Sequence, residues 1–130
     1  MGNPNTLRLA SKEFFQVATA TEERMNKEPN TEKKTVLRMV AAQCYFYAAV
    51  EAIESILGNA GIIVENHQDR IRKIEQNYRL FKNPNDLLTK HKIITQEGLN
   101  YLRRVAYRGE NGNKFIALKE FGEISQKEMP

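Results

Sequence analysis

The stretch MVAAQCYFYAAVEAI, residues 39–53, is apolar on nearly every side of the helix that it would form. Its alanines allow a neighbouring helix to approach closely, while the consecutive aromatic residues Tyr45, Phe46 and Tyr47 point in different directions. A helix that is apolar all round is usually buried in the centre of a protein or shared between two subunits. We therefore predict that this stretch is the core helix, with a dimer face formed by Cys44, Tyr47, Ala48 and Glu51.

The sequence marks both ends of this core helix. On the amino-terminal side, KEPNT (residues 27–31) interrupts the helical pattern, because proline and asparagine disfavour continuation of a helix. Thr31 is a suitable N-cap, and Glu32 in the first turn favours the helix dipole. On the other side, the segment GNAG predicts that the helix extends to about Leu57 and stops at Gly58.

The flanking segments also follow a helical period. One face of a preceding helix is formed by Leu7, Ala10, Phe14, Val17, Thr21 and Met25. A third helix is expected to start near Asn66, and its buried stripe is Ile71, Ile74, Tyr78 and Phe81. A fourth follows KNPND, with a face formed by Leu88, His91, Thr95, Leu99, Leu102 and Ala106. The tail KFIALKEFGEIS predicts a short last helix, anchored by Phe115, Leu118 and Phe121.

These elements predict an all-α fold, an antiparallel four-helix bundle with a short fifth C-terminal helix. No segment shows strand-like alternation or an internal repeat, and 130 residues suit one domain. We expect a single domain over residues 1–130, with flexible ends at 1–5 and 126–130. A chain of this length buries roughly two-thirds of its unfolded surface, so it needs no disulfide or metal in order to fold.

Composition favours a cytoplasmic protein. The single cysteine, Cys44, cannot form an internal disulfide, and its place in an apolar run indicates a structural thiol in a reducing compartment. No secretory signal is apparent, because the first residues are polar. The run of residues 39–53 is too short to cross a membrane and contains Gln43 and Glu51, so we expect no membrane association.

Positive charge is concentrated in the second half of the chain. Residues 1–69 carry seven basic and nine acidic side chains, whereas residues 70–114 carry eleven basic and four acidic ones. The segment YLRRVAYRGENGNKF, residues 101–115, mixes arginine, which forms bidentate contacts with phosphate, and aromatic residues, which stack on bases. The candidate nucleic-acid or phosphate contacts are Arg103, Arg104, Arg108 and Lys114, with Arg72, Lys73 and Arg79 extending the positive face. Stabilisation of a helix C-terminus also explains Arg103 and Arg104 without a ligand.

The sequence contains few residues that could form a catalytic site. A metal site is not expected, because one cysteine and two distant histidines lack the spacing of a zinc or di-iron site, and no cofactor motif is present. His91 lies on an apolar stripe, which favours a hydrogen-bonded core histidine. Glu51 and Glu54 are one helical turn apart, and such glutamates act as acid or base, pair with an arginine of a neighbouring helix, or face solvent. Glu51 and His91 are therefore only fallback catalytic candidates.

Two segments together resemble the HEPN superfamily, the higher eukaryote and prokaryote nucleotide-binding domains. The first is the alanine- and tyrosine-rich helix AAQCYFYAAVEAIESILGNAG, and the second is the basic helix that closes in LNYLRRVAYRGENG before a short tail helix. The resemblance spans roughly residues 7–125 and implies a small stand-alone prokaryotic protein. Many members are RNases, toxins of toxin–antitoxin pairs or partners of minimal nucleotidyltransferases, and they tend to form dimers that join two arginine-to-histidine motifs.

The chain departs from that motif. A histidine should follow the arginine after four to six residues, yet none follows Arg103, Arg104 or Arg108 at that spacing. Asn113 stands at a permitted position, but an amide cannot carry a proton. The resemblance therefore implies a binding protein rather than a nuclease.

We thus expect a non-catalytic, homodimeric HEPN-like bundle that binds RNA, a nucleotide or a partner protein such as a nucleotidyltransferase, within a toxin–antitoxin type of system. Two alternatives stay open. One is a divergent metal-independent RNase that uses Glu51 or His91, and the other is a purely structural homodimeric interaction module.

Overall fold

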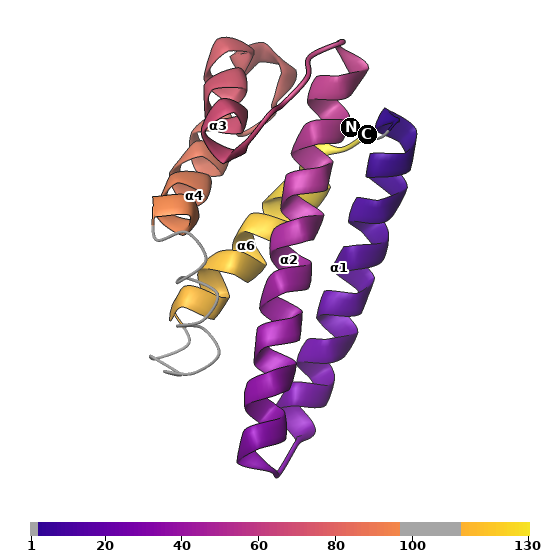
Figure 1. Ribbon diagram of the computed structural model, residues 1–130, viewed down its shortest axis with the longest axis vertical. Helices are drawn as coiled ribbons and strands as arrows, with labels where there is room; N and C mark the ends of the chain where they lie inside the picture. Colours follow the sequence, from indigo (N-terminus) through magenta and orange to yellow (C-terminus); the bar gives the residue numbers. More distant parts are fainter. Residues whose placement is uncertain (1–2, 97–112) are drawn as a thin grey trace.

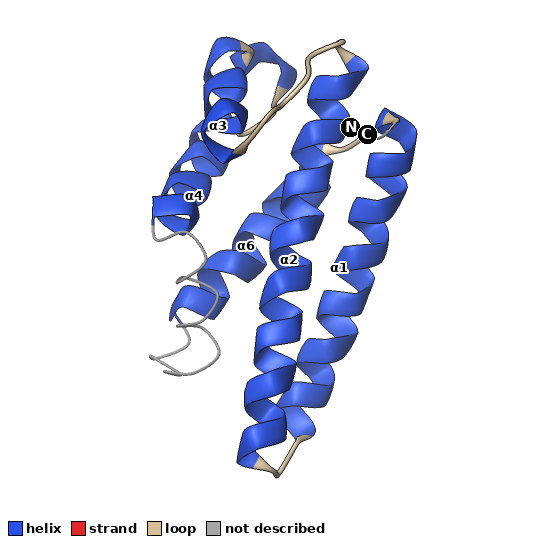
Figure 2. Cartoon of the chain, viewed as in Figure 1, coloured by secondary structure: helices blue, strands red, loops and turns tan. Residues whose placement is uncertain are grey.

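The computed structural model describes residues 3–96 and 113–130, and every regular element in these ranges is a helix (Figure 2). The elements are α1 (Pro4–Lys27), α2 (Thr31–Asn59), α3 (His67–Gln76), the 3-10 turn η1 (Tyr78–Leu80), α4 (Pro84–Gln96) and α6 (Asn113–Glu128). The predicted all-α class is confirmed. The described part also contains the predicted C-terminal helix, α6.

The two longest helices, α1 and α2, form an antiparallel hairpin (Figure 1). Residues 28–30 make the turn, and the side chain of Asn30 accepts a hydrogen bond from the Lys33 amide at 2.9 Å. Asn30 is therefore the N-cap, and Thr31, which we predicted as the cap, is the first helical residue. At the other end α2 runs to Asn59, and Gly61 takes up the positive φ of 78° that the following turn requires.

The buried face of α1 is rotated from the predicted one. Thr21 and Met25 are buried as expected, but Val17 is 41% exposed, and the small residues Ser11 and Ala18 are buried instead. The Ser11 hydroxyl donates a hydrogen bond of 2.6 Å to the Ala48 carbonyl of α2. Small side chains of α1 therefore face α2, where Ser11 contacts its backbone, and the larger apolar Val17 stays exposed.

The middle of α2 is the core of the protein, as predicted. Tyr45 is fully buried, its ring packs edge-on against Phe15 and Phe115, and its hydroxyl donates to Glu22 at 2.6 Å. The three predicted anchors of the C-terminal helix, Phe115, Leu118 and Phe121, are all buried. Consequently α1 lies on one side of α2 and α6 on the other (Figure 1).

Gly122 of α6 marks the closest approach of α6 to α2. A Cβ atom at this position would lie 3.1 Å from both the Tyr45 carbonyl oxygen and the Tyr45 ring. We expect Gly122→Val to lower the free energy of unfolding by about 1–3 kcal/mol, because the backbone oxygen of a buried helix cannot move aside. Urea denaturation followed by circular dichroism measures this. Ile116→Val, at a site 47% exposed on the same helix, is the control, and equal stabilities of the two variants would contradict the expectation.

The α3–η1–α4 segment is packed against the carboxyl-terminal half of α2 and against α6. Asn66 is the N-cap of α3, as predicted, and its side chain accepts a hydrogen bond from the Asp69 amide at 2.8 Å. Ile71, Ile74 and Phe81 are buried, but Tyr78 is 42% exposed, so its predicted place in the buried stripe is wrong. The α-helix ends at Gln76, and η1 then turns Tyr78 outward.

The fourth predicted stripe is only partly within the described residues. Leu88 and His91 are buried in α4 and Thr95 is half-buried, whereas Leu99, Leu102 and Ala106 lie outside the described ranges. Residues 126–130, where we expected flexibility, include the last turn of α6. There the Glu128 carboxylate accepts hydrogen bonds from the backbone amides of Lys82 and Asn83, at 2.6 and 2.8 Å.

In length and composition α2 could cross a membrane, which differs from the expectation that its apolar run is too short. Within the described residues it is the one helix with this property. Of its most apolar window, 44% is buried inside the protein, and the core helix of a soluble protein passes the same test. More than half of this apolar window of α2 is therefore not buried inside the protein.

Candidate functional site

A buried arginine on α3 joins three helices. Arg70 is only 5% exposed, and its Nε and Nη2 atoms both donate to Oε2 of Glu54 on α2, at 3.0 and 2.6 Å. A guanidinium and a carboxylate that are both removed from water need this direct pairing, since an unpaired buried charge is very unfavourable. Glu54 thus pairs with an arginine of a neighbouring helix, which was one of the three alternatives for the glutamate pair.

The third nitrogen of Arg70 contacts both histidines of the chain. Nη1 lies 2.6 Å from Nδ1 of His67, one turn earlier on α3, and 3.3 Å from Nε2 of His91 on α4. An arginine only donates hydrogen bonds, so these two ring nitrogens must be acceptors. We infer from this that the protons are on Nε2 of His67 and on Nδ1 of His91.

Both imidazoles are held in their neutral form. Burial lowers the pKa of His91 to about 4, and the positive charge of Arg70 acts in the same direction. Burial also lowers the pKa of His67, again assisted by Arg70 and opposed by Glu54. At neutral pH the cluster of Glu54, His67, Arg70 and His91 therefore contains one ion pair and two uncharged rings.

Aromatic rings enclose this cluster. The His67 ring lies 5.6 Å from Phe46 of α2, and the His91 ring lies 5.3 Å from Phe121 of α6, measured between ring centroids. The predicted core histidine is thus confirmed, because His91 has no exposed surface and contacts Arg70. His67 is exposed at the start of α3, so the cluster reaches the surface mainly there.

Glu51, the other fallback catalytic residue, lies one turn before Glu54 on α2. Its Oε2 atom is buried and accepts no hydrogen bond in the part of the chain that the structure describes. Burial raises the pKa of Glu51, and the nearby charge of Glu54 raises it further. The two candidate catalytic residues thus differ in setting, since His91 is wholly enclosed and Glu51 is half-buried.

The geometry is poorly suited to proton transfer. A general base needs a lone pair that can reach the substrate, and Arg70 occupies the acceptor nitrogen of each histidine. Arg70 in turn already has a carboxylate partner, so it is not available to a phosphate. Sequence reasoning missed this cluster, although the three-residue spacing of His67 and Arg70 at a predicted helix start could have indicated it.

The predicted phosphate-binding residues are only partly described. Arg103, Arg104 and Arg108 lie outside the described residues. Lys114, in the first turn of α6, is half-buried. Arg72 and Lys73 lie on α3 and Arg79 lies on η1; Arg72 and Arg79 are exposed, and Lys73 is half-buried.

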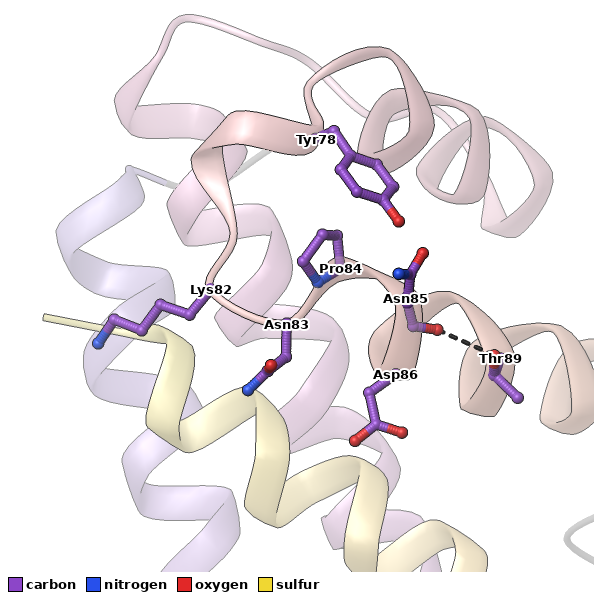
Figure 3. A pocket seen from close by; sticks show the side chains of 7 residues that line it. All are labelled: Tyr78, Lys82, Asn83, Pro84, Asn85, Asp86 and Thr89. Atoms are coloured by element: carbon purple, nitrogen blue, oxygen red, sulfur yellow. Dashed lines mark hydrogen bonds between the residues drawn. The ribbon is translucent and has the colours of Figure 1, made fainter.

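A surface pocket adjoins this basic segment (Figure 3). It has a volume of about 390 Å³ and is lined by Tyr78, Lys82, Asn83, Pro84, Asn85, Asp86 and Thr89. The Thr89 hydroxyl donates to the Asn85 carbonyl at 2.9 Å, and the Lys82 ammonium donates to the Lys127 carbonyl at 3.1 Å. The pocket thus combines an exposed aromatic ring with amide and charged groups, and sequence reasoning did not find it.

One of the four residues predicted to form a dimer face is not at the surface. Tyr47 is 44% exposed, and Cys44 is half-buried with the pKa of its thiol raised by burial. Ala48 has no exposed surface, because it is covered where α1 packs on α2, so it is not part of an outer face. Of the predicted set, Tyr47 is therefore exposed, and Cys44 and Glu51 are half-buried.

No group of three histidine, cysteine, aspartate or glutamate side chains in residues 3–96 and 113–130 is arranged to hold a metal ion. Comparison of the chain with protein-family models, with curated proteins and with solved structures gives no match.

Proposed function

We propose that the protein is a non-catalytic, cytoplasmic helical bundle of the HEPN-like, antiparallel four-helix type that binds single-stranded RNA. The surface that we assign to the RNA is the basic segment formed by α3, η1 and the start of α4, including the pocket beside Tyr78. In a toxin–antitoxin type of system, a nucleotidyltransferase-type protein is the partner that would compete with RNA for this surface.

The observation that carries the proposal is the exposed Tyr78 next to unpaired positive charge. Residues 67–96 contain seven basic and three acidic side chains. Four of the seven have acidic partners. These pairs are Arg70 with Glu54, Arg72 with Asp69, Lys90 with Asp86 and Lys92 with Glu75. Lys73 and Arg79 make no ion pair with any described residue, so they are available to phosphate groups.

The pocket supplies groups that suit a nucleotide. Its volume of about 390 Å³ is within the range of small-molecule sites. An exposed tyrosine ring can stack on any base, and the side-chain amides of Asn83 and Asn85 can form hydrogen bonds with base edges. Arg79, directly after Tyr78 in the chain, would then contact the adjoining phosphate.

The histidine–arginine cluster supports a binding role over a catalytic one. Both histidines have their acceptor nitrogens on Arg70, and the divergent RNase needs one of these rings, or Glu51, to move a proton. Metal-independent cleavage of RNA by the purified protein that is absent in Glu51→Gln would replace the binding proposal with the enzymatic one.

RNA binding is tested by titrating a fluorescent single-stranded RNA of mixed sequence over a range of salt concentrations. The logarithm of the affinity should fall with the logarithm of salt by about 0.7 for each phosphate neutralised. We expect Arg79→Ala to reduce that slope by about one such step. We expect Tyr78→Ala to weaken binding by about 1–3 kcal/mol through the lost stacking.

Arg24→Ala, at an exposed arginine of α1 far along the chain from this surface, is the matched control and should bind as the wild type does. Undetectable binding at low salt, or equal losses in Arg24→Ala and Arg79→Ala, would contradict the proposal.

A further inference from the structure

The α3 helix depends on its neighbours for stability. It has ten residues, and an isolated helix of this length is only marginally stable in water. Its buried residues are Asp69, Arg70, Ile71 and Ile74, so half of them are charged. We therefore expect α3 to stay folded only while its contacts with α2 and α4 last, and an important part of these contacts is polar.

The Arg70 guanidinium holds α3 to both neighbours. It donates two hydrogen bonds to Glu54 of α2, at 3.0 and 2.6 Å, and its Nη1 atom lies 3.3 Å from Nε2 of His91 on α4. His67 adds a second contact with α2, because the centroid of its ring lies 5.6 Å from that of Phe46. The polar attachment of α3 thus includes both histidines of the chain.

Both histidines can contact Arg70 in this way only as neutral rings. The Nη1 atom donates to Nδ1 of His67 at 2.6 Å and to Nε2 of His91 at 3.3 Å, and a guanidinium has no acceptor to offer in return. A proton on either ring nitrogen would turn an acceptor into a donor and place two positive charges side by side. That ring and Arg70 would then have to separate, so protonation and the docked position of α3 exclude each other.

The surroundings of both rings favour the neutral form as long as α3 is docked. Burial lowers the pKa of each histidine, and the positive Arg70 of the same helix lowers it further. On α2, the negative Glu54 acts in the opposite direction on the pKa of His67. His67 also lowers the pKa of His91, and α6 faces His91 with the uncharged ring of Phe121. Release of α3 would remove Arg70 from both rings and allow them to take up protons.

The two rings differ in their access to water. His67 is exposed, so its ring can turn outward and take up a proton without opening the core. His91 has no exposed surface, and its Nε2 atom faces Arg70. We therefore expect acid to act first on His67, which weakens the docking of α3, and then on His91.

The other long helices are held together by contacts of their own. Glu22 of α1 accepts hydrogen bonds from the Tyr45 hydroxyl of α2 at 2.6 Å and from the Lys119 ammonium of α6 at 3.1 Å. Near the other end of α1, the Gln126 amide of α6 donates to the Ser11 hydroxyl at 2.7 Å. These contacts do not involve α3, so its release leaves them in place.

We propose that α3 is a pH-sensitive element of the fold: uptake of protons by His67 and His91 separates both rings from Arg70 and releases α3 from α2 and α4, while α1, α2 and α6 stay packed together. This local opening goes beyond RNA binding. It is tested without RNA, so either proposal can fail alone.

The test is hydrogen exchange of the full chain between pH 7.5 and 5.5, followed by mass spectrometry. The results are expressed as protection factors, which correct for the effect of pH on intrinsic exchange. We expect the amides of α3 to be less protected than those of residues 45–57 of α2 at every pH, because α3 opens separately. Below pH 6.5, protection of α3 should fall by up to about tenfold per pH unit for each histidine that gains a proton on opening.

Two results with the wild type would overturn the proposal. Equal protection of α3 and of residues 45–57 would show that the protein opens only by global unfolding. Protection of α3 that does not change with pH would show that no proton is taken up when it opens.

Substitution of the histidines locates the protons. The double variant His67→Gln and His91→Gln has no histidine, and both glutamines can still accept a hydrogen bond from Arg70. Its α3 protection should be nearly independent of pH in this range. Arg72→Gln, an exposed change on the same helix, is the matched control and should keep the pH dependence of the wild type.

The single variant His67→Gln keeps the experiment decisive if the double variant does not fold, because this site is exposed. It should retain the fold and show a weaker pH dependence of α3 protection than the wild type. An unchanged pH dependence in either histidine variant would overturn the proposal.

Discussion

Arg70→Met is expected to lower the free energy of unfolding by about 3–5 kcal/mol, which is a large part of the roughly 5–15 kcal/mol that stabilises a typical domain. The methionine keeps much of the volume of the side chain but removes the two hydrogen bonds to Glu54 and the contacts with both histidines. The Glu54 carboxylate, whose side chain is 14% exposed, would then stay in the protein without its counterion.

The experiment is urea unfolding followed by circular dichroism, with two further variants. Arg72→Met is the matched control, because its side chain is 62% exposed and lies 4.0 Å from Asp69, and we expect a loss below about 0.5 kcal/mol. Arg70→Met combined with Glu54→Met should recover much of the stability, since an apolar pair can replace a buried ion pair. A loss in the double variant equal to the sum of the single losses would show that the two side chains do not stabilise each other.

Stability is also expected to fall as the pH is lowered from about 6.5 to about 4, with His91 as a main cause. The ordinary histidine pKa near 6.5 applies to the unfolded chain, and burial lowers the pKa of His91 in the folded protein to about 4. Between these values the unfolded chain binds a proton that the folded protein does not bind, so acid favours unfolding. The slope is about 1.4 kcal/mol for each pH unit, or roughly 3 kcal/mol in all.

Comparison with His91→Gln isolates this contribution. Glutamine does not titrate, and its carbonyl oxygen can still accept a hydrogen bond from Arg70. His67 has its pKa lowered as well and acts in the same direction in both proteins, whereas the raised pKa of Glu51 acts in the opposite direction. The free energy of unfolding of the wild type minus that of His91→Gln, measured by urea unfolding, should therefore decrease as the pH is lowered from about 6.5 to about 4. Parallel profiles of the wild type and His91→Gln would contradict the assignment.

The helices were predictable from the sequence because their signals are local. The stop and cap residues around residues 27–31 and at Asn66 act within one turn, and they place the helix ends to within a residue or two. The C-terminal anchors Phe115, Leu118 and Phe121 were also found, because a buried helix needs an apolar row at this spacing.

The errors in the buried faces have identifiable causes. The sequence suggested Val17 for the interior because it is apolar, but close packing of α1 on α2 selects small residues such as Ser11 and Ala18. Tyr78 continues the apolar spacing of α3, but the helix stops before it. The Asn77 side chain donates a hydrogen bond to the Lys73 carbonyl at 2.9 Å there, and the following residues form a 3-10 turn. A period of 3.6 residues does not extend through such a break.

The histidine–arginine cluster was less accessible because its members come from three helices. Glu54, Arg70 and His91 are separated by 16 and 21 residues, and no spacing within one helix shows that they meet. Arginine is usually a surface residue. The burial of Arg70 is explained only by its ion pair with Glu54 of α2. The predicted arginines of residues 103–108 lie outside the described ranges, so their role in RNA binding remains a prediction.

The position of α6 against α2 has a consequence for folding during synthesis on the ribosome. Tyr45 and Phe46 of α2 are covered by Phe115 and Phe121 of α6, which follow them by about seventy residues. During translation, α1 and α2 can pair as soon as both have left the ribosome, and α3 can then cover part of Phe46, but Tyr45 and Phe46 lack their α6 partners until α6 emerges. The nascent chain thus exposes aromatic surface of α2 for much of its synthesis. Chaperones bind exposed apolar surface of this kind.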